Sequence, residues 1–177
     1  MGRCTISVFG RDRPGIVAAV AGELADAGCN LEDSSMTILR GHFAMMLVVL
    51  APPETDAEAL STRLEPVRLR LDLDVSVRAI HAEVTGAAPL GEPYAIAVYG
   101  ADRPGLVARV SEALAARDVN IVDLETRVVG EPDPVYVMHF EVEVPPGRAE
   151  EVEADLRAVG ADLGVETSMR PDEPDVL

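Results

Sequence analysis

Two turn-like segments, residues 10–15 and 100–105, carry residue types suited to binding a small charged molecule, and both read Gly-x-Asp-Arg-Pro-Gly. An Asp carboxylate can accept hydrogen bonds from an ammonium group. The last glycine lets a ligand approach backbone N–H donors at a helix N-terminus, which attracts carboxylates. An Asn follows each turn at the same spacing, and its amide offers a donor and an acceptor, as an amino acid zwitterion requires. The candidate binding residues are Asp12, Gly15, Asn30, Asp102, Gly105 and Asn120.

The same residues also have a purely structural interpretation, which stays open at this point. Gly10 and Gly100 allow unusual backbone angles, the prolines suit a first helical turn, and the Asp side chains would compensate exposed helix N–H groups. Asn30 and Asn120 would then only tolerate or cap the turn before a strand.

The two turns belong to a longer internal repeat. Residues 8–17 recur as residues 98–107, and residues 28–33 match residues 118–123 in the same register. Self-similarity at a fixed offset determines the architecture, so the chain is predicted to hold two similar domains. Domains this small bury little surface alone, and each is expected to pack on the other or on a second chain.

Apolar periodicity predicts the elements of each half. In the first half the expected strands are 3–9, 30–39, 42–50 and 74–80, and the expected helices are 16–27 and 56–71, with Pro66 ending or bending the second helix. The second half repeats this order with strands 94–99, 120–129, 135–144 and 164–169 and helices 106–117 and 149–159. The predicted fold class is α+β: two ferredoxin-like βαββαβ domains in tandem, each an antiparallel four-stranded sheet with two helices on one face.

Composition places the domain boundaries. A stretch rich in Gly and Pro separates the halves, and the chain ends in a polar segment. The predicted organisation is a first domain at 1–81, a linker at 82–93, a second domain at 94–169 and a polar tail at 170–177.

The third strand of each half predicts what covers the outer face of its sheet. In the first half both alternating sets of residues 43–50 are apolar, so this sheet is expected to be covered on both faces. In the second half His139, Glu141 and Glu143 alternate with apolar residues, and this outer face is expected to be wetter.

The charge excludes some functions. The net charge is −16, and residues 89–177 hold 7 Arg against 19 acids, so direct nucleic-acid binding is not expected. No apolar run approaches the length of a membrane span and no leader opens the chain, which predicts a soluble, cytoplasmic protein.

Catalytic and metal-binding patterns are weak. His42, His81 and His139 show no metal-ligand spacing, and no metal or cofactor is expected. Cys4 and Cys29 fall on predicted strands, do not form a disulfide framework, and Cys29 is interpreted as a buried strand cysteine rather than a nucleophile.

The repeated turn, the helix after it and the segments Gly28–Leu31 and Asp118–Ile121 resemble the ACT domain, a ferredoxin-like module that commonly binds amino acids at domain interfaces. The first half also resembles the glycine cleavage system transcriptional repressors, which are tandem ACT proteins. The resemblance implies ligand contacts from the turn and from the Asn that opens the second strand. One departure concerns the ligand: some serine-sensing ACT domains carry a His where this chain has Gly10 and Gly100.

The resulting hypothesis is a non-enzymatic regulatory protein that binds a small amino acid, glycine or serine in type. It would act through a protein partner such as a transcription factor, and so regulate transcription indirectly, as a homodimer. Two alternatives remain open: a ligand-independent interaction or oligomerisation module, and a regulatory subunit of an amino-acid-metabolising enzyme.

Overall fold

The computed structural model describes residues 2–80, 91–130, 132 and 134–172. The chain divides into two compact units, Met1–Thr85 and Gly86–Leu177. Most of the predicted linker and most of the predicted tail lie outside the described residues. Two strands extend past the predicted boundaries, since one begins at Glu92 and another ends at Pro171.

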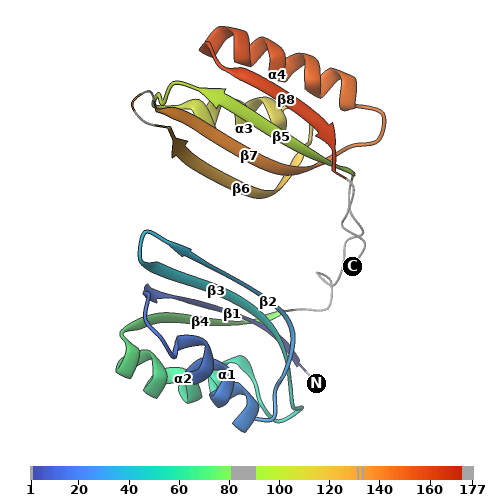
Figure 1. The fold of residues 1–177 in the computed structure, drawn as a ribbon. Helices are drawn as coiled ribbons and strands as arrows, with labels where there is room; N and C mark the ends of the chain where they lie inside the picture. Colours follow the sequence, from blue (N-terminus) through green and yellow to red (C-terminus); the bar gives the residue numbers. More distant parts are fainter. Residues whose placement is uncertain (1, 81–90, 131, 133, 173–177) are drawn as a thin grey trace. The chain divides into compact units, whose positions relative to one another are not determined.

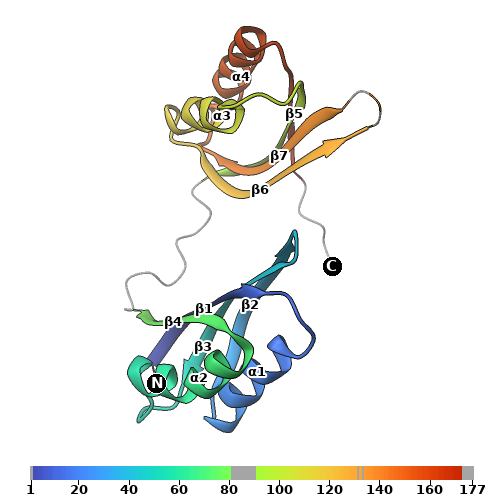
Figure 2. The ribbon, with the colours of Figure 1, turned by 90° about the vertical axis from the view of Figure 1, so that its left-hand side faces the viewer.

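Unit 1 is a four-stranded antiparallel sheet with both helices on one face (Figures 1 and 2). The strand order is β2-β3-β1-β4, so β2 and β4 are the edges. Its elements are β1 (Gly2–Arg11), α1 (Ile16–Asp26), β2 (Asn30–Leu39), β3 (His42–Ala51), α2 (Ala57–Leu71) and β4 (Leu73–Ile80).

Unit 2 repeats this architecture with the strand order β6-β7-β5-β8. Its elements are β5 (Glu92–Gly100), α3 (Leu106–Ala115), β6 (Asn120–Val129), β7 (Val135–Val144), α4 (Ala149–Leu163) and β8 (Glu166–Pro171). The predicted α+β class and the tandem ferredoxin-like fold are confirmed.

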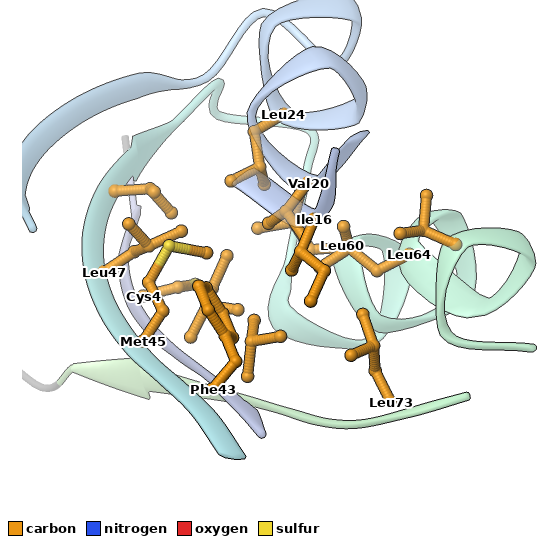
Figure 3. Packing of buried hydrophobic residues seen from close by; sticks show 14 of the residues in the cluster. Cys4, Ile16, Val20, Leu24, Phe43, Met45, Leu47, Leu60, Leu64 and Leu73 are labelled. Carbon is orange, nitrogen blue, oxygen red and sulfur yellow. The ribbon is translucent and has the colours of Figure 1, made fainter. Parts of the chain in front are cut away.

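The core of each unit lies between the helices and the sheet. In unit 1 the side chains of Ile16, Val20 and Leu24 project from one face of α1 towards the sheet, where Leu47 and Phe43 meet them (Figure 3). Each fully buried side chain of this kind stabilises the fold by about 1.5–3 kcal/mol. The corresponding α3 residues of unit 2 are Leu106, Val110 and Leu114.

The alternative that Pro66 ends the second helix was wrong, whereas the alternative that it bends the helix stays a prediction. Helix α2 continues from Ala57 to Leu71 with Pro66 inside it. Leu64 and Val67 on either side of the proline are both buried in the core. Their packing offsets the backbone hydrogen bond that proline cannot make, so tertiary contacts outweigh local propensity here.

Glycines of the β1–α1 region serve two different purposes. The expectation of an unusual backbone at Gly10 was wrong, because its φ is not in the left-handed region. Gly10 lies inside β1, where a Cβ atom would come within 2.6 Å of Leu73 Cδ2. Gly15 has the unusual backbone instead, with φ +94°, and it occupies the N-cap position of α1 without a side chain to cap the helix. Gly105 repeats this conformation before α3, with φ +92°.

The outer face of the unit 1 sheet is not covered within the unit, so the cover expected from its third strand would have to come from outside the unit and stays a prediction. Met46 is 57% exposed and Phe9 is 49% exposed, although their neighbours in sequence point into the core. In unit 2 the outer face carries His139, Glu141 and Glu143, as the alternation predicted.

The conformation of Gly15 yields a stability prediction. Replacing Gly15 with Ala would place a Cβ on a left-handed residue and destabilise unit 1 by about 1–2 kcal/mol. Gly22 is the matched control, because it lies in the middle of α1 with open space around its Cβ position. Gly22→Ala is expected to stabilise the same unit by up to about 1 kcal/mol. Urea denaturation measures both, and equal effects of the two substitutions would contradict the assignment.

Candidate functional site

The β1–α1 turn of unit 1 leaves the helix N-terminus without a side-chain cap. Gly15 is the N-cap residue, and no side chain accepts a hydrogen bond at this position. Asp12 therefore does not cap the helix, contrary to the structural interpretation of its role. Its backbone N–H instead donates to the carbonyl of Gly41, at 2.9 Å, and ties the turn to the β2–β3 hairpin. The exposed Asp12 carboxylate and the N–H groups of the first helical turn remain available to a ligand.

The second turn has the same backbone and a different side-chain environment. Gly105 caps α3, again without a side-chain hydrogen bond. Arg103 donates from Nη1 to the carbonyl of Leu163 at 3.3 Å, at the C-terminal end of α4. An open hollow of about 540 Å³ lies over this helix start and is lined by residues 102–108 and Tyr136. Asp102 and Gly105 thus both line one surface depression.

Asn30 and Asn120 lie at the other end of their sheets. Asn30 opens β2 and pairs with Leu50, which in turn pairs with Arg3 near the start of β1. The turn of unit 1 instead follows Arg11, which pairs with His42 at the far end. At about 3.4 Å per strand residue, these two rows are roughly 27 Å apart.

The six predicted binding residues are therefore not brought together within either unit. In unit 2 Asn120 pairs with Glu143, which pairs with Pro93, whereas the turn follows Gly100 at the opposite end of β5. Asp12 lies near Gly15, and Asp102 lies near Gly105, but each Asn is separate. A ligand that contacts both a turn and an Asn needs a second ACT-like unit.

The two Asn side chains differ in their surroundings. Asn120 Nδ2 donates to Glu143 Oε2 at 3.4 Å. Asn30 is exposed and lies beside Leu50, and within the described ranges its side chain makes no hydrogen bond. Only the amide of Asn120 is thus partly engaged by a carboxylate.

The structure also contains an apolar groove that the sequence interpretation missed. It lies between α1 and the edge strand β2, and its volume is about 150 Å³. Its lining residues are Val17, Ala21, Leu31, Ser34, Ser35, Met36, Met45 and Leu47. The sequence signal for this groove was the set of apolar residues Leu31, Met36 and Ile38 along β2. They face the same side of the sheet as the core, but β2 is an edge strand that the helices do not fully cover. The groove contains no charged group and suits an apolar side chain better than a zwitterion.

The cysteines do not form a reactive centre. Cys4 is buried in β1, whereas Cys29 lies between α1 and β2 and is only half-buried, so its prediction as a buried strand residue was wrong. Both thiols are free. Burial raises the pKa of the Cys29 thiol, nearby Cys4 adds to the rise, and Arg63 opposes it. Cys29 is therefore a protonated thiol at neutral pH.

The acidic and histidine side chains do not form a metal-binding cluster in the described part of the chain. Across residues 2–80, 91–130, 132 and 134–172, no three His, Cys, Asp or Glu side chains are arranged to hold a metal ion. His42 stacks on Phe9 with ring centroids 6.0 Å apart, and His139 lies on the outer sheet face. His81 falls outside the described residues. In the part of the chain that is described, no helix is long and apolar enough to cross a membrane.

Comparison with known proteins agrees with this architecture. The family model of the ACT domain matches the chain twice, at residues 4–78 and 92–170. A crystal structure of an unknown protein from Galdieria sulphuraria is 28% identical and superposes with a TM-score of 0.83, covering 97% of this chain and 99% of that one. A second structure, of a candidate glycine cleavage system transcriptional repressor, is 20% identical with a TM-score of 0.68 over 96% of both chains, and shows the fold alone.

Two sequence relatives extend this comparison. The glycine cleavage system transcriptional repressor of Escherichia coli is 28% identical over 122 residues, which are 69% of this chain and 63% of the repressor. A UPF0237 protein of Methanopyrus kandleri is 42% identical over 79 residues, 44% of this chain and 88% of its own length. The chain is thus similar both to a protein of about half its length and to a longer transcriptional repressor.

The raised thiol pKa predicts the reactivity of Cys29. At pH 7 we expect Cys29 to react with iodoacetamide more slowly than free cysteine, and the rate to rise steeply towards alkaline pH as the thiolate forms. Mass spectrometry of the labelled peptides measures both rates. Cys4, only 2% exposed, is the internal reference and should label only after denaturation. Labelling of Cys29 at pH 7 as fast as free cysteine would show that the site activates the thiol.

Proposed function

Since the chain belongs to the ACT domain family through both of its halves, we propose that it is a non-enzymatic regulatory protein that binds a small amino acid at ACT interfaces. The ligand is of the glycine or serine type, and the protein acts through a protein partner. The observation that carries this proposal is the uncapped helix N-terminus beside an exposed Asp, present in both units.

The chemistry of the turn supports an amino acid ligand. Free N–H groups at the start of α1, together with the helix dipole, favour a carboxylate, and the Gly15 Cα leaves open space for its approach. The Asp12 carboxylate complements an ammonium group. Both charged groups of a zwitterion therefore have a counterpart within one short turn, and a ligand with a small side chain satisfies them without needing a deep pocket.

The separation of turn and Asn supports binding between ACT units rather than inside one. The row of Asn30 and the row next to the turn are at opposite ends of β1. A second copy of the chain, related by a two-fold axis, would supply the missing Asn to each turn. Ligand binding would then favour the paired state, and occupancy would be coupled to assembly.

The first half is the better candidate site. Asn120 is held by Glu143, whose negative charge would repel a ligand carboxylate, whereas Asn30 has the apolar Leu50 in the same position. Unit 1 also carries less of the chain's excess negative charge. We therefore assign amino acid binding chiefly to Asp12, Gly15 and Asn30, with Asp102, Gly105 and Asn120 as a weaker second set.

The regulated process follows from the relatives by analogy. The Escherichia coli relative is described as a transcriptional repressor of the glycine cleavage system. The net charge of −16 opposes direct contact with DNA phosphates. The proposed mode is therefore indirect regulation, in which the partner protein, such as a transcription factor, makes the nucleic-acid contacts.

Calorimetric titration of the full chain with a panel of amino acids tests the proposal. We expect heat of binding from glycine or serine. Asn30→Ala should weaken binding by about tenfold or more, because it removes a hydrogen bond to a charged group. Asn120→Ala is the matched control and should change the affinity much less.

Two outcomes would contradict the proposal. No binding by any amino acid in the panel would support the ligand-independent interaction module instead. Binding that neither Asn substitution alters would place the ligand elsewhere, and the apolar groove beside β2 would then be the first place to look.

A further inference from the structure

We propose that the open face of the unit 1 sheet is an interaction surface that pairs with the same face of a second copy of this chain. This open face consists of the side chains of β1–β4 that point away from α1 and α2. The inference is independent of amino acid binding, because it concerns assembly of the chain without ligand.

The centre of the open face combines apolar side chains with small hydroxyl side chains. Strand pairing aligns Met46 with Ser7 and Ser35 in one row, and the adjacent rows contain Ala44 and Val48. Met46, 57% exposed, is the largest side chain in its row and projects above two small serines. Small neighbours let another sheet approach to about 10 Å, and the flexible thioether can adapt to its counterpart.

Charge identifies the second copy as the occupant. The strands place three Arg and three acidic side chains on or beside this face, so it is neutral in a chain of net charge −16. These residues are Arg3, Arg11, Arg78, Glu32, Asp33 and Asp74. Arg3 and Glu32 are already paired at 2.6 Å. Two identical acidic chains repel each other over most of their surface, and this face, whose charges balance, avoids that penalty.

The outer face of unit 2 is an internal comparison. It occupies the same place in the same fold and carries five acidic side chains against two Arg. The acids are Asp123, Glu125, Glu141, Glu143 and Glu166, and the arginines are Arg127 and Arg170. In this sheet His139 takes the place that Met46 has in unit 1. His139 pairs with Ala97 of β5, and Met46 pairs with Ser7, the equivalent residue of β1. Self-pairing of this face would bring like charges together, so only the unit 1 face suits an identical partner.

The area of the open face is sufficient for a reversible dimer. Four strands spaced about 4.8 Å apart and roughly 27 Å long give about 500 Å² per copy. Two copies would bury about 1,000 Å², which is at the lower limit for a specific interface. Aligned packing at about −30°, as in β-sandwiches, would bring the two Met46 rows together at the centre.

Sedimentation velocity of the ligand-free chain over a range of concentrations tests this inference. We expect the wild type to dimerise, and Met46→Glu to raise the dimer dissociation constant at least tenfold by placing two carboxylates at the centre of the interface. His139→Glu introduces the same charge at the matching place of unit 2 and should leave the dissociation constant unchanged. Circular dichroism and the melting temperature check that both variants fold as the wild type does.

A wild type that stays monomeric would overturn the inference, as would a dimer that Met46→Glu does not weaken. Equal weakening by Met46→Glu and His139→Glu would overturn it too, because the effect would then not be specific to the open face. Loss of dimer in Met46→Glu alone supports it, whether or not the chain binds an amino acid.

Discussion

The antiparallel return of α1 along β1 determines where every candidate binding residue lies. The chain passes from β1 through the uncapped turn into α1, runs back, and enters β2 at the opposite end of the sheet. The turn and Asn30 are therefore kept apart by the full length of a strand, and no change of side-chain conformation can join them. Any site that uses both residues must be completed by another unit, so the topology would link the proposed ligand binding to assembly.

Much of the fold could be predicted because local patterns and tertiary structure agree. Alternation along residues 74–80 predicted a strand, and the structure contains it as β4. The Arg40-Gly41 pair predicted a hairpin turn, and in the structure these residues have φ values of +48° and +81°. The repeat at a fixed offset then doubled the information available for each element. Where a residue's role depends only on its own stretch of chain, sequence was sufficient.

The remaining features depend on partners distant in sequence. Gly10 is needed because Leu73, more than sixty residues later, approaches its Cα, and Pro66 is tolerated because the residues around it are buried. The candidate binding residues were grouped by type, but their separation follows from strand register, which spacing along the chain does not reveal. The groove beside β2 was missed for a related reason: the apolar residues of an edge strand predict burial, and only the helix positions show that they are left uncovered.

The duplicated fold has allowed the two halves to diverge at equivalent positions. Val48 of β3 corresponds to Glu141 of β7, and Met46 corresponds to His139, so one outer face is neutral and the other acidic. Beside the first residue of β2 or β6, Leu50 corresponds to Glu143. Asn30 therefore has an apolar neighbour, whereas the amide of Asn120 donates to Glu143. None of these exchanges touches a core position, and each changes only what the surface can meet. A chain built this way can keep one stable architecture in both halves while its two outer faces differ in charge, and a difference of this kind would let the proposed self-association of the first half exclude the second.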